Sequence, residues 1–333
     1  MTPLTRDAGI RIPLICGAMY PCSNPELVAA ASRAGGIGIV QPISLTYVHG
    51  YDFREGVRRT LALAGGRPIG MNALIEASSR TYRRRMEGWI DIALEEGIRF
   101  FVTSLGKPDW VVERVHAVGG KVYHDVTELK WAEKGLESGV DGLIAVNRQA
   151  GGHPGNLDPE SLLDEVGGLG LPVVCAGGVG NEAEFIRMTG MGYDGVQMGT
   201  RFVATRECRV SEPYKAAIVA ASADDIVWTE RITGVPVAVI RTPFVEAAGT
   251  EVGPVARRLL QWRPTKHLTR SWLVLKSLWT LKRTSMDESA QKEYWQAGRS
   301  VESISRIESA EEIVERFGRA WLARRDAGTG PSD

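Results

Sequence analysis

The fold is decided by two short apolar runs that each end in a glycine turn: residues 172–180, PVVCAGGVG, and residues 195–202, GVQMGTRF. Glycine lets the backbone approach an anion closely, and the amide groups that follow such a turn can donate to a phosphate. Phosphates often bind at the loops after the seventh and eighth strands of a βα barrel. The two turns therefore predict a phosphate site at Gly177, Gly178, Gly199 and Thr200. Two tight turns without a ligand are the alternative.

Six further apolar runs precede these two and form a regular series with them. The eight predicted strands are residues 14–19, 37–41, 68–74, 99–104, 121–126, 142–147, 172–178 and 195–200. They recur at the interval of one strand–loop–helix–loop unit, and most are apolar throughout, as is typical of strands covered on both faces. The segments between them carry helical signals, with Pro25 near one start and Gly35-Gly36 at the following end. This alternation predicts an α/β fold, a closed (β/α)₈ (TIM) barrel, with an open doubly wound sheet as the alternative.

The pattern changes after Pro213, and this change predicts three regions. Residues 1–215 form the barrel, residues 216–295 a helical lid or insertion, and residues 296–326 a C-terminal helix that returns to the barrel. The lid is expected because residues 250–295 hold several tryptophans among many Lys and Arg residues, and because residues 266–282 have an amphipathic helical pattern. The returning helix begins at a capping-box pattern, Ser309-Ala310-Glu311-Glu312.

The composition excludes several classes of partner. Forty basic residues balance forty acidic ones among 333, so the excess positive charge of a nucleic-acid-binding protein is missing. No apolar run reaches the roughly 20 residues that a membrane span needs, and no secretory signal is expected at the N-terminus. The four cysteines form no CxxC pair and are too few for a disulfide framework, and no histidine pair has a metal-ligand spacing. We therefore expect a cytoplasmic enzyme without a metal site.

His153 is the candidate acid–base residue. It lies between Gly152 and Pro154-Gly155, just beyond the sixth predicted strand, where the loops of a βα barrel carry the chemistry. Imidazole titrates near neutral pH, so it can take a proton from carbon or return one to a product. A loop histidine that only holds backbone geometry is the alternative. The other histidines are weaker candidates: His49 in a loop after strand two, His116, His124 and His267.

Several segments together resemble the nitronate monooxygenases, formerly called 2-nitropropane dioxygenases. The matching segments are residues 13–19 (PLICGAM), 25–31 (PELVAAA), 34–38 (AGGIG), 150–155 (AGGHPG), 176–178 (AGG), 195–202 (GVQMGTRF) and 295–301 (WQAGRSV). The resemblance covers about residues 10–215 and 293–325. It is specific for the FMN-binding superfamily and less specific for the reaction.

The resemblance implies a βα barrel that binds FMN beneath a helical domain. The residues that it places against the flavin are Gly17, Ala18, Met19, Asn72, Asp125, Ala150, Gly151, Gly152, Ala176, Gly177, Gly178, Gly199 and Thr200. It also implies that His153 is the base toward neutral nitroalkanes and a positioning group for nitronates. The expected reaction is the oxidation of an alkyl nitronate by O₂ to a carbonyl compound and nitrite. The oligomeric state is left open, with a homodimer as one form.

Two departures from the family pattern concern charge near the flavin. Relatives often place a lysine at the end of strand five, near the pyrimidine edge of the ring, where this chain has Asp125. A carboxylate there would oppose anionic reduced flavin unless it is protonated or paired. Relatives also often carry glycine and glutamate before the AGGH segment, where this chain has Asn147-Arg148-Gln149. One hypothesis is that Arg148 replaces the missing positive charge.

Three other functions are compatible with the same motifs. The first is an NAD(P)H-dependent FMN reductase that acts on a quinone or an enoyl thioester. The second is a barrel that only binds a phosphate ligand, without catalysis. The third is a barrel similar to IMP dehydrogenase, which would need a nucleophilic cysteine after strand six, where this chain has His153.

Overall fold

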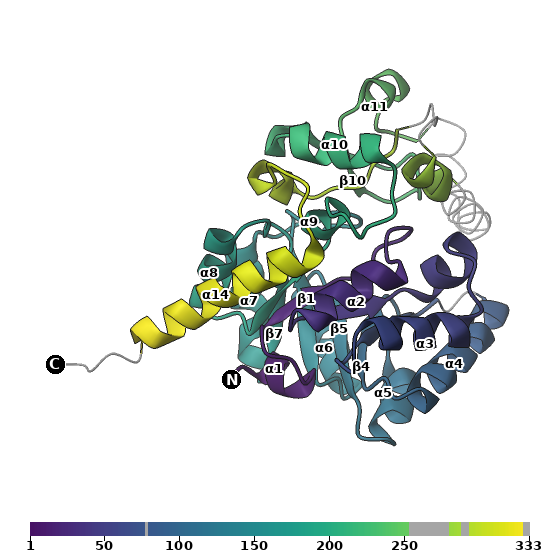
Figure 1. The fold of residues 1–333 in the computed structure, drawn as a ribbon, viewed down its shortest axis with the longest axis vertical. Helices are drawn as coiled ribbons and strands as arrows, with labels where there is room; N and C mark the ends of the chain where they lie inside the picture. The colour runs from purple at the N-terminus through teal and green to yellow at the C-terminus, as the bar shows by residue number, and fades with distance from the viewer. Residues whose placement is uncertain (77–78, 253–279, 288–292, 329–333) are drawn as a thin grey trace.

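Eight parallel strands close into a barrel in the computed structural model, which describes residues 1–76, 79–252, 280–287 and 293–328 (Figure 1). The strands are β1 (Leu14–Cys16), β2 (Ile37–Val40), β3 (Gly70–Leu74), β4 (Phe100–Ser104), β5 (Lys121–Val126), β6 (Gly142–Val146), β7 (Val173–Ala176) and β8 (Gly195–Met198). Ile15 of β1 pairs with Ile37 of β2 on one side and with Gln197 of β8 on the other, which closes the sheet. Each strand lies within its predicted run, so the predicted (β/α)₈ barrel is confirmed.

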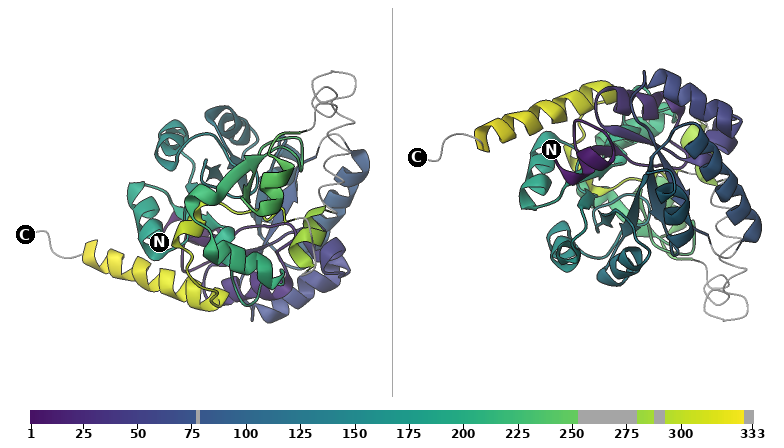
Figure 2. Two further views of the ribbon diagram at one scale, coloured as in Figure 1. Left: turned by 90° about the horizontal axis from the view of Figure 1, so that it is seen from above. Right: turned by 90° about the horizontal axis from the view of Figure 1, so that it is seen from below.

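An outer ring of helices surrounds the strands, as the views from above and below show (Figure 2). The helices that follow strands one to seven are α2 (Pro25–Arg33), α3 (Phe53–Leu63), α4 (Arg80–Glu95), α5 (Asp109–His116), α6 (Leu129–Glu137), α7 (Pro159–Val166) and α8 (Glu182–Met191). After β8 comes only a single turn, α9 (Thr200–Val203). Among the described helices, none is long and apolar enough to cross a membrane.

The C-terminal helix α14 (Ala310–Gly328) occupies the eighth place in this ring, because it packs between α2 and α8. Its Phe317 ring is fully buried, and the ring centroid lies 5.4 Å from that of Phe185 on α8. Buried Arg201, which directly follows the second glycine turn, donates to the carbonyl oxygen of Arg306 ahead of α14. The end of the chain thus helps to hold the turn after β8.

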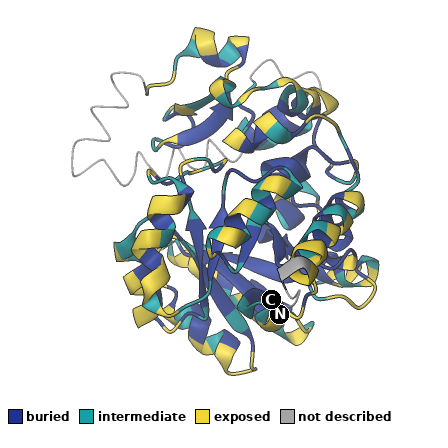
Figure 3. Ribbon diagram, turned by 90° about the vertical axis from the view of Figure 1, so that its left-hand side faces the viewer, coloured by how far each residue is buried: buried dark blue, intermediate teal, exposed yellow. Residues whose placement is uncertain are grey.

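Apolar side chains fill one end of the barrel. The short helix α1 (Pro3–Asp7) covers this end and inserts Leu4 into a cluster with Phe100, Tyr123 and Ile144. The barrel strands are buried along their length, whereas the outer helices expose one face (Figure 3). Because α1 closes the N-terminal ends of the strands, a ligand can reach the barrel only at the C-terminal ends.

The segment between α9 and α14 forms a separate layer above those C-terminal ends (Figure 1). It contains α10 (Glu212–Ala220), α11 (Pro243–Ala248) and helical residues 280–286, and also an antiparallel pair, β9 (Ile226–Thr229) and β10 (Val237–Ile240). The prediction for this region was a helical lid, so the strand pair was not expected. Each of these strands has only four residues and pairs with the other. The regular strand–helix repeat that indicates the barrel therefore does not indicate this pair. Much of the predicted amphipathic helix over residues 266–282, and Trp262, Trp272 and Trp279, lie outside the described residues.

Candidate active site

The two glycine turns lie side by side, because β7 and β8 are neighbours in the barrel. Gly177 and Gly178 have φ angles of +114° and +78°, which residues with a Cβ atom rarely adopt. A Cβ on Gly177 would lie 2.6 Å from the Ala150 nitrogen, and one on Gly178 would lie 2.2 Å from the Gln149 Oε1 atom. Both positions therefore require glycine for backbone geometry and for space.

The N–H groups of the first turn are divided between a helix cap and the open end of the barrel. The Glu184 carboxylate accepts from the backbone nitrogens of Gly180 (2.7 Å) and Asn181 (3.2 Å), and Asn181 Oδ1 caps the Glu184 nitrogen in return. The start of α8 is thus satisfied by its own capping box. Within the described ranges, the Gly178, Gly199 and Thr200 amides donate no hydrogen bond. An anion would be held by these three loop amides rather than by the start of α8.

A strap of residues 295–300 lies against the second turn and the loop after β6. Its Gly298 nitrogen donates to Thr200 Oγ1 at 2.9 Å, and its Arg299 nitrogen donates to the Gln149 carbonyl at 2.9 Å. A Cβ on Gly298 would come within 2.6 Å of the Gly151 nitrogen, so the strap lies directly against the loop after β6. Because the strap binds both loops, it fixes the spacing between the second turn and the His153 segment.

Buried Asn147 joins the loop after β6 to the first turn. Its Nδ2 donates to the Gly177 carbonyl at 3.1 Å, and its Oδ1 accepts from the Gln149 nitrogen at 2.8 Å. Ala150, which follows Gln149, is buried against the same turn. Asn147 was not among the residues predicted to bind the flavin. The available signal was an amide side chain at the end of an otherwise apolar strand.

His153 contacts the layer above the barrel. Its Nε2 lies 3.3 Å from Thr233 Oγ1, and the Thr233 hydroxyl donates to the Val235 carbonyl at 3.0 Å. With its hydroxyl hydrogen donated to Val235, Thr233 can accept from Nε2–H of His153 in the tautomer that carries the proton on Nε2. The Gly152 carbonyl accepts from the Ala238 nitrogen of β10 at 2.7 Å. The β9–β10 hairpin thus holds the exposed His153 side chain in place.

Polar side chains face the open end of the barrel from three strands. Asn72 on β3 is buried and donates to the Val102 carbonyl at 3.2 Å. Burial raises the pKa of the Asp125 carboxyl to about 7. Within the described part of the chain, Asp125 Oδ1 and Gln197 Oε1 are buried and accept no hydrogen bond. Gln197 was missed by the sequence analysis, although it is the one polar residue in the run GVQM of β8.

The predicted residues of the first strand meet the second turn. Gly17 packs under Gln197, because a Cβ on Gly17 would lie 2.9 Å from the Gln197 Cγ atom. Ala18 and Met19 are partly exposed at the open end, and the Met19 nitrogen donates to Ser23 Oγ at 2.9 Å. The Met19 sulfur would lie 3.4 Å from a Cβ on Gly199. The structure therefore brings the predicted β1 residues beside the predicted phosphate turn.

Arg148 does not compensate the charge of Asp125. Its side chain is exposed. The pKa of Asp158 is lowered mainly by hydrogen bonds from Ser161, and the charge of Arg148 adds a smaller lowering. The raised pKa of Asp125 has burial as its cause, without a contribution from a neighbouring cation. The hypothesis that Arg148 supplies positive charge to the flavin stays a prediction; its backbone nitrogen donates to the Leu157 carbonyl just beyond the end of β6.

The remaining histidines have other surroundings. His124 is buried outside the barrel interior, 2.8 Å from Thr103 Oγ1, and burial lowers its pKa to about 4. His49 Nε2 lies 3.2 Å from the Pro21 carbonyl, and burial lowers the pKa of His49 to about 4 as well. His116 contacts Asp141, and His267 lies outside the described residues. Across the described ranges, no three ligand-type side chains gather into a metal cluster.

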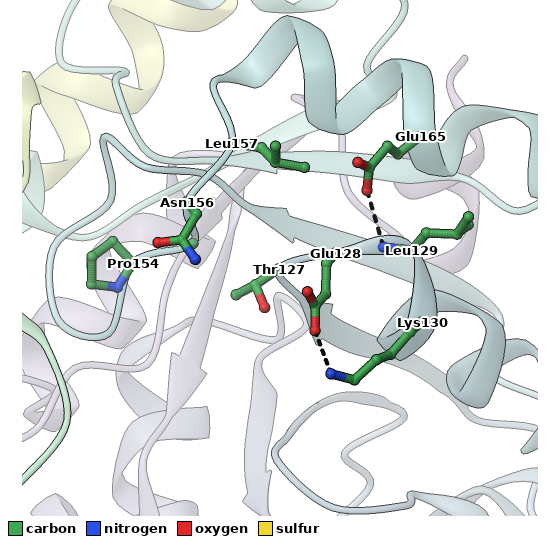
Figure 4. A pocket seen from close by; sticks show the side chains of 9 residues that line it. Thr127, Glu128, Leu129, Lys130, Pro154, Asn156, Leu157 and Glu165 are labelled. Atoms are coloured by element: carbon green, nitrogen blue, oxygen red, sulfur yellow. Dashed lines mark hydrogen bonds and ion pairs between the residues drawn. The ribbon is translucent and has the colours of Figure 1, made fainter.

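A cavity of about 360 Å³ adjoins the far side of the His153 loop (Figure 4). Its lining residues are Thr127, Glu128, Leu129, Lys130, Pro154, Gly155, Asn156, Leu157 and Glu165. Glu128 and Lys130 form an ion pair of 2.8 Å at its rim. The lining includes neither His153 nor the glycine turns, so this cavity is separate from the candidate active site.

Comparisons with known proteins agree with this arrangement. A sequence model of the family described as nitronate monooxygenase matches residues 1–318. A protein of Mycobacterium tuberculosis named (3aS,4S,5R,7aS)-5-hydroxy-7a-methyl-1-oxo-octahydro-1H-indene-4-carboxyl-CoA dehydrogenase is 30% identical over 249 residues, which cover 74% of this chain and 67% of that protein. A probable nitronate monooxygenase of Staphylococcus saprophyticus is 27% identical over 282 residues, which cover 73% and 79% of the two chains.

Among solved structures, FabK from Thermotoga maritima superposes with a TM-score of 0.78 at 26% identity and covers 99% of both chains. The overlap extends beyond the barrel to the layer above it. With the family match over residues 1–318, this chain is an oxidoreductase that belongs to the nitronate monooxygenase family.

Proposed function

We propose that the protein is an FMN-dependent nitronate monooxygenase, which uses O₂ to oxidise an alkyl nitronate to a carbonyl compound and nitrite. The observation that carries this proposal is the set of amides at Gly178, Gly199 and Thr200, which lie on adjacent turns and donate no hydrogen bond within the described residues. The family match and the probable nitronate monooxygenase of Staphylococcus saprophyticus support the choice of reaction.

The residues present fit FMN at both ends. The Thr200 hydroxyl oxygen already accepts from Gly298, so its own hydrogen can be donated to a phosphate beside the three amides. At the open end of the barrel, Asn72, Asp125 and Gln197 present hydrogen-bonding groups to a ring with an amide-like edge. Bound FMN supplies the electron transfer between substrate and oxygen.

His153 handles the proton. The imidazole of His153, whose Nε2 lies against Thr233, takes a proton from the carbon next to a nitro group. A nitronate has already lost that proton, so it needs His153 for positioning alone. The hairpin that holds His153 also covers the site, because Ala238 of β10 bonds to Gly152. Such a cover limits the access of water to the reacting atoms.

A second candidate is an NAD(P)H-dependent FMN reductase that acts on an enoyl thioester or a quinone. One specific observation favours a thioester: the relative that is 30% identical is named as a dehydrogenase of a carboxyl-CoA compound. The probable nitronate monooxygenase of Staphylococcus saprophyticus has a comparable sequence identity of 27%, so identity alone does not separate the two candidates. The two candidates share the flavin site and differ in the electron donor.

Anaerobic mixing separates the two candidates. FMN-loaded protein is mixed with a nitronate, with NADH or with NADPH, and the flavin absorbance is followed. Bleaching by nitronate alone supports the monooxygenase, and rapid bleaching by NADH or NADPH supports the reductase. Protein that retains no FMN refutes both proposals.

Cellular location and assembly are further parts of the proposal. A cytoplasmic location is supported by the four cysteines, which are all buried and unpaired. A homodimer is the assembly that we propose to test, by light scattering of the FMN-loaded protein.

A further inference from the structure

Asp125 occupies an unusual place for a carboxyl group. It is the one carboxylate in the eight barrel strands. Side chains alternate along a strand, so Asp125 points to the same side as Tyr123, which is buried in the barrel interior with Phe100 and Ile144. His124, between them, points outward to Thr103. Asp125 therefore lies inside the barrel, one step nearer the open end than Tyr123.

Among the described residues, no positive charge contributes to the electrostatics of this carboxyl. Its Oδ1 atom is buried and has no hydrogen-bond partner among the residues described. The strands beside it, β4 and β6, are FFVTS and GLIAV and carry no charge. From other strands of the barrel, β3 contributes Asn72 and β8 contributes Gln197.

The other titratable groups on the neighbouring described strands have their own partners or lie outside the barrel interior. The Tyr123 hydroxyl donates to Asp7 at the closed end of the barrel. Lys121, also on β5, is bound to Asp141 at the start of the strand. Cys16 and Cys175 pack in the outer core between strands and helices. Asp125 as a whole is half-buried, but a carboxylate with one buried, unpaired oxygen is still costly, and desolvation accordingly raises the pKa of Asp125 to about 7.

We propose that Asp125 contacts the flavin ring as a neutral carboxylic acid and donates a hydrogen bond to it, in the place where relatives carry a cation. This inference rests on the proposed FMN function. The neutral acid tolerates electron-rich reduced flavin, whereas the carboxylate repels it. Loss of one proton from Asp125 therefore weakens FMN binding and lowers the flavin midpoint potential.

The consequence is a pH dependence of cofactor affinity. If only the protonated form holds the ring well, the FMN dissociation constant is flat below neutral pH and rises up to about tenfold per pH unit above it. Asp125→Asn keeps the size and the donor but cannot ionise. Its dissociation constant stays flat in the same range.

FMN titrations by fluorescence quenching from pH 6 to pH 9 test the proposal on the wild type, Asp125→Asn and Asp194→Asn. Asp194 is a matched control, because burial also raises its pKa but it binds the Val173 nitrogen at the closed end. The proposal expects the alkaline rise in the wild type and in Asp194→Asn, and its absence in Asp125→Asn. Equal pH profiles in all three proteins overturn it.

A second readout is the flavin midpoint potential at pH 6 and pH 9. Between pH 6 and pH 9, the flavin midpoint potential of the wild type is expected to fall further than that of Asp125→Asn. Equal decreases in the two proteins contradict the proposal. If Asp125→Asn does not fold, as judged by circular dichroism, Asp125→Ser provides the same comparison. Wild-type protein that binds FMN without a pH step refutes the Asp125 proposal alone. Wild-type protein that binds no FMN at any pH refutes the proposed function with it.

Discussion

Asn147 donates a hydrogen bond of 3.1 Å from Nδ2 to the carbonyl oxygen of Gly177, and so connects the loop that bears His153 to the first glycine turn. The same side chain accepts from Gln149 at 2.8 Å. One buried amide thus satisfies two backbone groups on neighbouring loops. The position of the proton-handling residue and the geometry of the phosphate site depend on this amide together.

Asn147→Ala should weaken FMN binding. The substitution leaves a buried donor and a buried acceptor without a partner, at a cost of about 2 kcal/mol. We expect the FMN dissociation constant to rise by roughly tenfold or more and the melting temperature to fall. Fluorescence titration and thermal denaturation measure the two effects. Asn156→Ala, which removes an exposed amide from the same loop, is the control. Equal affinities of the two variants would contradict the connecting role.

Gly178→Ala should abolish FMN binding, and backbone strain alone should not account for this loss. The added Cβ meets Gln149 Oε1 at 2.2 Å, in the cradle of the predicted phosphate site. Gly170→Ala is the matched control, because Gly170 has a similar φ of +74° with nothing within 4 Å. Both variants should lose about 1–2 kcal/mol of stability from the left-handed backbone. Only Gly178→Ala should fail to retain FMN, and retention in both would exclude this turn from the site.

His153→Asn should separate neutral nitroalkanes from nitronates as substrates. The amide cannot take a proton, so kcat/KM for a neutral nitroalkane is expected to fall by about 10²–10⁴-fold. Turnover of the preformed nitronate should fall far less. Steady-state oxygen consumption with each substrate provides the measurement. Thr233→Val, which removes the partner of Nε2, should cause a smaller loss. Unchanged nitroalkane turnover in His153→Asn would remove His153 from the reaction.

The stability of FMN-free protein should depend on Asp125 as pH rises. The folded-state pKa, about 7, exceeds the unfolded value of 3.8, so the folded state binds the proton more tightly. Stability from this group is complete below the unfolded pKa and is lost as pH rises to about 7. Asp125→Asn avoids this loss, which amounts to at most roughly 4 kcal/mol. Urea denaturation at pH 5 and pH 8 should show a larger advantage of the variant at pH 8, and a constant difference would contradict the raised pKa.

The barrel could be predicted from sequence because its signals are local. An apolar run such as residues 142–147 predicts a buried strand by itself, and the glycine turns after residues 176 and 198 stand at strand ends. The pair β9 and β10 was not predicted, since two four-residue runs pair across a loop without any repeat. Fold class therefore follows from periodicity, whereas the content of the insertion depends on pairing that periodicity does not record.

The candidate site could be predicted only in part. Motif positions placed the turns and His153 at the strand ends, where the structure has them. The contacts of His153 with Thr233 and of Thr200 with Gly298 join segments far apart in the chain, so no local pattern indicates them. The exposure of Arg148 also depends on the path of its loop. Gln197 could have been noticed as a polar residue within an apolar strand.

The position of the flavin phosphate tests the central claim most directly. A crystal structure of the FMN-loaded protein is expected to show phosphate oxygens within hydrogen-bond distance of the amide nitrogens of Gly178, Gly199 and Thr200. The ring should then extend toward Asn72 and Asp125. A phosphate bound elsewhere, or a protein that crystallises without FMN from a solution that contains it in excess, would contradict the account.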